Sequence, residues 1–141
     1  MADREFQRAG HECINAFAVD DYYLFKHYFE GDEVFARLGR YYNNQQYRFE
    51  VPAGDFESIQ SFGANHGYGL VAIDQASIPE FVVVVRKYTD HPDNIFKPSV
   101  IHRASENYNC FLMTNQNAVE QTVTKGALRL TQTSLRNPFQ A

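Results

Sequence analysis

The most hydrophobic run of the chain is PEFVVVVRKY, residues 79–88, in which positions 82–85 are all valine. A strand that is apolar on both faces is typical of the middle of a covered sheet. The run becomes polar at Arg86 and Lys87, where we expect the strand to end at the edge of the sheet. The following stretch, YTDHPDNIFKP at 88–98, contains the Asp, Pro and Asn residues that favour turns.

A pattern of strand, capped helix, glycine and strand precedes this run. Strands are predicted at 46–51 and 69–73 from their β-branched and aromatic residues. Between them, Asp55 is the expected helix cap, and Gly67 is the expected helix stop. A helix this short that returns to a strand suits a crossover between parallel strands of one sheet.

The same pattern occurs again after the run. The predicted strands are 107–114 and 127–132, and the helix between them begins at Asn115 or Asn117 and ends at Gly126. Because sequence identity between the two occurrences is slight, we interpret them as similar in architecture only. SVIHRA at 99–104 predicts a further strand, paired in a hairpin with the first strand of this second unit.

Two aromatic segments lie before both units. YYLFKHYF at 22–29 follows two aspartates that can cap a helix, but its spacing also suits a strand. EGDEVFARLGRYYNN predicts a helix capped by Asp32, with Phe35 among the residues on one side, and Gly39 marks its end or a close packing contact. The first segment therefore stays open between helix and strand.

Together these elements predict an α+β fold with a mixed sheet and helices mainly on one face. It is ferredoxin-like in the broad sense, and is built from two strand-helix-strand units preceded by aromatic N-terminal helices. No low-complexity linker interrupts the chain, so we expect one domain over 1–141, with 1–18 and 133–141 extended or frayed. Such an architecture says nothing certain about function.

Composition narrows the class of protein. The 141 residues are 44% hydrophobic and 21% charged, near the globular average, which predicts a self-sufficient core. The net charge of −4 gives no broad attraction to nucleic acid or to an anionic membrane. Because neither a secretory signal nor a long apolar segment is found, we expect a soluble, cytoplasmic protein. Cys13 and Cys110 lie outside any C-x-x-C spacing and are expected to stay reduced.

Aromatic residues are unusually frequent, with 9 tyrosines and 12 phenylalanines, and they concentrate in the first third of the chain. Such rings form a core, a subunit interface or a stacking platform for the bases of a single-stranded nucleic acid. The acidic net charge disfavours the last. A homo-oligomer is the expected partner arrangement, and the candidate interface residues are Tyr22, Tyr23, Phe25, Tyr28 and Phe29.

The stretch 88–98 also holds residue types that bind transition metals or transfer protons. Asp90, His91 and Asp93 are close in sequence, and His102 lies on the next predicted strand. His91 and His102 are the catalytic candidates, and all four residues form an alternative metal site. Metal ligands normally occupy helix or hairpin spacing on rigid elements, and Asp and Pro are common in turns, so the turn interpretation is preferred.

Four cations surround the same stretch and predict a weak anion site. They are Arg86, Lys87, Lys97 and Arg103. If they gather into a positive rim, they hold a phosphate or carboxylate through charge-assisted hydrogen bonds. The simpler interpretation is a set of solvated strand ends.

The sequence contains no P-loop, no G-x-G-x-x-G and no G-x-S-x-G, so we expect no cofactor. The leading hypothesis is a non-catalytic binding or interaction domain that self-associates through its aromatic region or an open sheet edge. One alternative is a small metal-dependent hydrolase of phosphodiesters that uses residues 90–102. A further alternative is a regulatory domain that senses a small anion.

Overall fold

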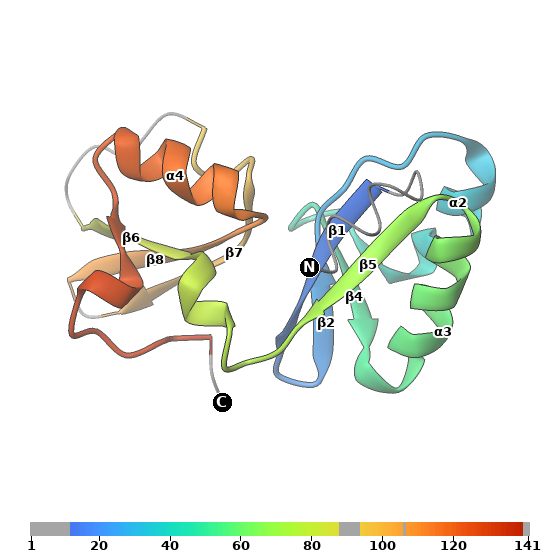
Figure 1. The fold of residues 1–141 in the computed structure, drawn as a ribbon, viewed down its shortest axis with the longest axis horizontal. Helices are drawn as coiled ribbons and strands as arrows, with labels where there is room; N and C mark the ends of the chain where they lie inside the picture. The colour runs from blue at the N-terminus through green and yellow to red at the C-terminus, as the bar shows by residue number, and fades with distance from the viewer. Residues whose placement is uncertain (1–11, 88–93, 106, 140–141) are drawn as a thin grey trace. The chain divides into compact units, whose positions relative to one another are not determined.

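The computed structural model of the chain describes residues 12–87, 94–105 and 107–139. They divide into two compact units, here called unit 1, up to Ile73, and unit 2, from Asp74 (Figure 1). The predicted α+β class is confirmed. The predicted single mixed sheet is wrong, because each unit has its own sheet: a mixed sheet of five strands and an antiparallel sheet of four. The single folding domain and the ferredoxin-like comparison stay predictions.

The sheet of unit 1 has the order β3-β4-β2-β1-β5. Strand β5 is parallel to β1, and the other neighbours are antiparallel. It follows that β4 and β5 point the same way, so the predicted crossover between parallel strands is confirmed for this unit. The strands are β1 Glu12–Val19, β2 Tyr22–Phe25, β3 Tyr42–Asn43, β4 Arg48–Pro52 and β5 Tyr68–Ile73.

A two-residue turn joins β1 to β2. Asp20 has φ +55°, which matches the positive φ that tight hairpin turns require and that Asp tolerates. Asp20 and Asp21 therefore form the turn of a β-hairpin and do not cap a helix. Of the two interpretations of 22–29, the strand is the one observed, at Tyr22–Phe25. The pairing on both sides makes β1 an inner strand, although the sequence suggests no strand there.

Two helices belong to unit 1, α2 at Asp32–Leu38 and α3 at Ala53–Asn65. Gly39 ends α2, as one prediction allowed. The predicted caps at Asp32 and Asp55 are both wrong, because the N-cap positions are Gly31 and Pro52 and neither helix has a side-chain cap. Asp55 instead accepts a hydrogen bond of 3.2 Å from the Tyr41 hydroxyl.

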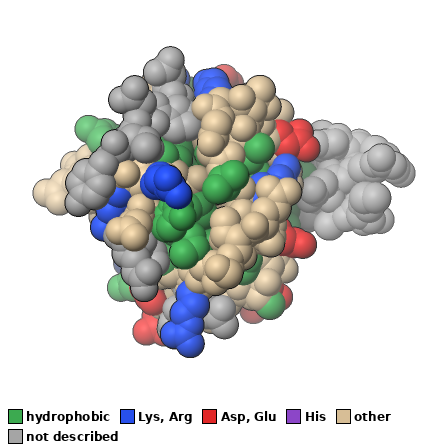
Figure 2. All heavy atoms as spheres, turned by 90° about the vertical axis from the view of Figure 1, so that its left-hand side faces the viewer, with side chains coloured by type: hydrophobic (Ala, Val, Ile, Leu, Met, Phe, Trp, Pro, Cys, Tyr) green, Lys and Arg blue, Asp and Glu red, His purple; other side chains and the backbone are tan. Residues whose placement is uncertain are grey.

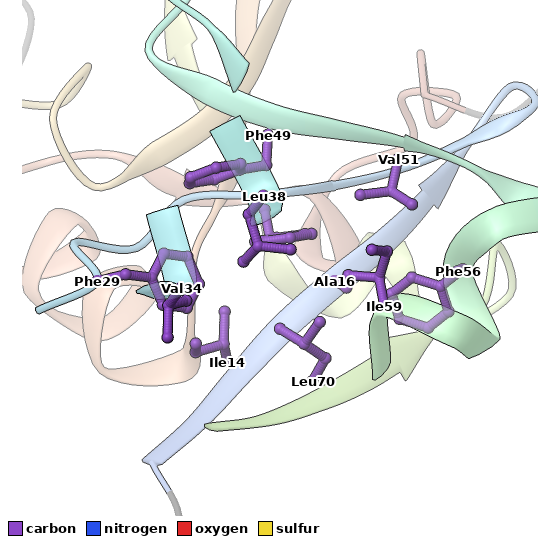
Figure 3. Close-up of a cluster of buried hydrophobic side chains, with 11 residues drawn as sticks. Ile14, Ala16, Phe29, Val34, Leu38, Phe49, Val51, Phe56, Ile59 and Leu70 are labelled. Carbon is purple, nitrogen blue, oxygen red and sulfur yellow. The ribbon is translucent and has the colours of Figure 1, made fainter. Parts of the chain in front are cut away.

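The core of unit 1 lies between its helices and one face of its sheet (Figure 3). Val34 and Leu38 of α2 and Ile59 of α3 meet Ile14 and Leu70 of the sheet. These side chains are at most 5% exposed, which accounts for much of the hydrophobic stabilisation of the unit. Both helices therefore contribute to a single cluster with the sheet.

The sheet of unit 2 has the order β7-β8-β6-β9, with every neighbouring pair antiparallel. The predicted buried inner strand is confirmed as β6, and its four valines are at most 6% exposed. The predicted hairpin of β7 and β8 is also confirmed. The strands are β6 Val82–Arg86, β7 Ser99–Ser105, β8 Tyr108–Met113 and β9 Leu128–Arg129.

Helix α4, Gln116–Thr124, covers one face of this sheet. The predicted cap is confirmed, since Asn115 Oδ1 accepts a 2.8 Å hydrogen bond from the Ala118 amide. Strands β8 and β9 lie on either side of β6 and are parallel to each other, so the second crossover is confirmed too. The last strand is shorter than predicted, because a 3-10 helix begins at Leu130.

Candidate functional site

Three of the five predicted interface residues belong to the core of unit 1. Phe25 is fully buried and Phe29 is 6% exposed. Tyr23 is partly buried, and its ring stacks on Phe56 with the ring centroids 4.0 Å apart. Tyr23 and Phe25 are two residues apart on β2 and therefore share one face of the strand, the face that packs into the core of unit 1.

The other two predicted interface residues are on the surface. Tyr22 is 45% exposed and Tyr28 is 84% exposed. Two further exposed aromatic residues of unit 1 lie outside the predicted interface, Phe35 at 48% and Tyr47 at 66%. Four large aromatic side chains among residues 12–73 are therefore exposed to solvent.

The sequence predicts Phe35 among the residues that share one side of helix α2, yet it is 48% exposed. The buried pair of this helix is Val34 and Leu38, which are spaced by four residues. Phe35 is one position off that pair, and its ring contacts Tyr42 and Phe49 at centroid distances of 5.9 and 6.2 Å. In the sequence, the apolar residues Val34 and Leu38, four positions apart, identify the buried side of this helix.

Two arginines, one in α2 and one directly after it, lie close to aromatic rings of unit 1. The guanidinium carbon of Arg37 is 5.9 Å from the centroid of Phe62, and that of Arg40 is 5.3 Å from the centroid of Tyr41. Aromatic and arginine side chains of this kind are enriched among the residues that dominate binding energy in protein interfaces. The α2 surface with its following 3-10 turn is thus chemically suited to contact another protein.

A cavity of about 280 Å³ lies where α2 begins and β5 begins. Its lining residues include the acidic Glu30, Asp32 and Glu33, together with His66 and Tyr68. The Glu30 amide donates to the Tyr68 hydroxyl at 3.3 Å, and His66 Nε2 is 3.9 Å from Glu33 Oε2. The cavity is therefore rich in negative charge, and a cation is the ligand that its chemistry favours.

The predicted metal and catalytic residues are not brought together in the described part of the chain. Asp90, His91 and Asp93 lie outside the described residues. His102 is on β7, which β8 separates from β6, so the strand that carries His102 is not a neighbour of the strand that precedes 88–98. The His102 ring stacks on Phe111 at 5.3 Å. Within residues 12–87, 94–105 and 107–139, no three His, Cys, Asp or Glu side chains are grouped to hold a metal ion.

Two of the predicted anion-binding cations lie at opposite ends of the sheet of unit 2. Arg86 pairs with Tyr108 at the start of β8, whereas Lys97 closely precedes Ser99, which pairs with Met113 at its end. On the face that Figure 2 shows, the lysine and arginine side chains are separate groups around a central hydrophobic area.

Arg103 has a structural role in unit 2. Its Nη1 donates a 2.9 Å hydrogen bond to the carbonyl of Pro138, and its guanidinium carbon is 5.6 Å from the centroid of the Phe139 ring. Phe139 is fully buried. Arg103 therefore holds the segment around residue 138 in place, and the sequence contains no signal for that role.

Burial shifts two titratable groups. Partial burial, and then the positive charge of Arg48, lower the pKa of Lys26. Arg48 in turn forms an ion pair of 2.8 Å with Glu50. Burial raises the pKa of Cys110, so its thiol stays protonated and is a poor nucleophile.

Comparisons with known proteins add no functional information for this chain. No family model, no curated protein and no solved structure matches it. Among the helices in the described residues, none has the combination of length and hydrophobicity that a membrane span requires. Inference about function therefore starts from the surface chemistry of the two units.

Proposed function

We propose that this chain is a non-catalytic binding or interaction protein that self-associates through exposed aromatic side chains of unit 1. The observation that carries the proposal is the exposure of Tyr22, Tyr28, Phe35 and Tyr47, from 45 to 84%. Full burial of a phenylalanine is worth about 1.5–3 kcal/mol, so a half-exposed Phe35 leaves roughly 1 kcal/mol unrealised in a single chain. Contact with another copy recovers that free energy.

The α2 surface has the composition of an interface centre. Phe35 lies beside Tyr42, and two arginines in and directly after the same helix, Arg37 and Arg40, each lie close to a ring. Tyrosine loses little conformational freedom for the area that it buries, and tyrosine and arginine are both enriched among the residues that dominate binding energy in interfaces. We place the self-association surface here and extend the predicted interface beyond Tyr22 and Tyr28.

The two alternatives have no specific observation in their favour. The hydrolase depends on Asp90, His91 and Asp93, which lie outside the described residues. The anion sensor depends on cations of which Arg86 and Lys97 lie at opposite ends of β8. Neither alternative is carried further.

Sedimentation equilibrium of the full chain tests the proposal, with a pair of matched variants. Phe35→Ser removes an exposed ring from unit 1, and Phe96→Ser removes a ring of similar exposure, 51%, from unit 2. We expect Phe35→Ser, combined with Tyr28→Ser, to weaken self-association by about tenfold or more. Phe96→Ser should leave it unchanged.

Circular dichroism of each variant checks that the secondary structure is retained. Two results count against the proposal: a chain of 16.3 kDa that stays monomeric at all concentrations, or equal weakening by Phe96→Ser. The second result would assign the contact to unit 2.

A further inference from the structure

Among the described residues, strand β5 is an edge of the sheet of unit 1. Within the described residues it pairs only with β1, over six consecutive residue pairs without a bulge. Its sequence, YGLVAI, has no charged residue and no proline. A regular, uncharged edge of this length is a template for pairing with another strand.

The other edge strands of the two described sheets are protected by recognisable devices. Strands β3 and β9 are only two residues long. Strand β7 is long but carries a register shift between Ser99 and Ile101, and it includes a charged residue, Arg103. Short length, bulges and charge are the features that keep edges from pairing, so β5 differs from the rest.

A side chain of α3 identifies the backbone groups that face outward from β5. Gln60 Nε2 donates a 2.8 Å hydrogen bond to the Leu70 carbonyl, so this carbonyl is not part of the ladder with β1. The N–H and C=O of one strand residue point to the same side, and residues two apart share that side. The exposed Ala72 therefore also directs its N–H and C=O to the open edge.

The acidic cavity lies at the other end of the same strand. Tyr68, the first residue of β5, is part of its lining, as are three carboxylate residues. Its volume of about 280 Å³ is below the roughly 300–1,000 Å³ of sites for small-molecule ligands. A cavity of this size is suited to one side chain, and its charge selects a cationic one.

We infer that β5 binds an extended segment of another protein, which adds a strand to the sheet and places a Lys or Arg side chain in the acidic cavity. In such complexes backbone hydrogen bonds provide affinity, and a side-chain pocket provides specificity. The inference rests on the proposed function, that of an interaction protein, and adds the partner's chemistry. Phe35 does not line the acidic cavity, although Asp32, Glu33 and Val34 of the same helix do.

Labelled synthetic peptides and the full chain test the inference by fluorescence anisotropy. The probes alternate Thr and Val, have blocked termini, and carry one Arg at the amino end or at the carboxyl end, because either strand direction suits an edge. Matched peptides carry Glu in place of Arg. One of the Arg peptides should bind about tenfold more tightly than its Glu counterpart.

Three variants separate the contributions of the edge and of the cavity. Ala72→Pro removes an outward N–H at an edge position, where proline is tolerated, and should abolish binding of the Arg peptide. Glu33→Gln should weaken the Arg peptide by about fivefold, since one favourable charge interaction is lost. Glu57→Gln makes the same charge change on an exposed residue of α3 that does not line the cavity, and should have no effect.

Equal affinity for the Arg and Glu peptides, or equal effects of Glu33→Gln and Glu57→Gln, would overturn the inference. Sedimentation of the same samples separates it from the proposed function. Self-association without peptide binding would refute this inference alone, whereas a monomer that binds the Arg peptide would refute only self-association. If Ala72→Pro dissociates the oligomer, the edge is occupied by a second copy, and the inference is wrong.

Discussion

Units 1 and 2 share one local pattern and differ in what surrounds it. Each contains a strand, a helix ended by a glycine and a strand parallel to the first. In unit 1 the buried cluster includes Phe25, Phe29, Phe49 and Phe56, whereas in unit 2 it is mainly aliphatic, with Phe111 as its ring. The pattern therefore specifies a crossover between two parallel strands. The other strands that pair with these two determine the composition of the sheet.

The charge of the two units also differs. Residues 1–73 contain eleven acidic and six basic residues, a net charge of −5, and residues 74–141 contain six acidic and seven basic residues, a net charge of +1. The overall charge of −4 is therefore the sum of an acidic unit 1 and a slightly basic unit 2. A basic partner is thus attracted to unit 1 in particular.

The largest expected effects come from removing a core ring from one unit at a time. Phe49→Ala and Phe111→Ala each delete a side chain that is at most 1% exposed, so each should cost its unit about 3–5 kcal/mol. Hydrogen exchange resolved by peptide should show lost protection only in the unit that carries the substitution. Loss of protection in both units would support the single cooperative domain that the sequence predicts.

Substitution of two corresponding glycines tests whether α3 and α4 end through the same backbone conformation. Gly67 and Gly126 have φ of +85° and +113°, and no atom lies within 4 Å of an added Cβ. Substitution of either by Ala should lower the free energy of unfolding by about 1–2 kcal/mol, through backbone strain alone. Denaturant titration measures both.

Gly54→Ala is the control for this pair, because Gly54 lies in α3 with an ordinary φ and open space at its side-chain position. It should stabilise by about 0.5–1 kcal/mol, since Ala favours the helix. A loss at Gly54 as large as that at Gly67 would show that side-chain crowding, and not φ, controls the cost.

The sequence predicts a side-chain cap at the start of both α3 and α4. Loss of the predicted cap residue should nevertheless destabilise the two helices to different extents. Asn115 caps α4 by a side-chain hydrogen bond, so Asn115→Ala should cost about 1 kcal/mol. Asp55 lies inside α3 and bonds the Tyr41 hydroxyl at the surface, so Asp55→Ala should cost about 0.5 kcal/mol. Equal costs in denaturant titrations would contradict the observed cap positions.

The smallest expected effect concerns Lys26 and its pH dependence. Because its pKa is lowered on folding, charged Lys26 disfavours the folded state at every pH below that lowered value. The penalty decreases as pH rises through this value and is absent above 10.5, where the lysine is neutral in both states. Lys26→Met should therefore be slightly stabilising at pH 7, and its advantage should shrink towards pH 10.5. A stabilisation by Lys26→Met that increases with pH would contradict this prediction.

Local sequence patterns predict much of the fold, but they do not predict which strands pair with one another. The valine run, the Asn115 cap and the stops at Gly67 and Gly126 are readable because each depends on neighbouring residues. The division into two sheets depends on which distant strands pair, as when β1 joins β5, and no periodicity encodes that choice.

The candidate surfaces were less predictable than the fold. An aromatic residue suits a core and an interface equally well, so sequence spacing alone does not separate the buried Phe25 from the exposed Tyr28. The role of Arg103 depends on a contact with Pro138, 35 residues away. The acidic cavity combines α2 with the start of β5, segments that are distant in sequence.

Sedimentation equilibrium of the unmodified full chain tests self-association most directly. Self-association predicts a weight-average mass that rises above 16.3 kDa as concentration increases. A mass that remains at 16.3 kDa over the whole concentration range would contradict it.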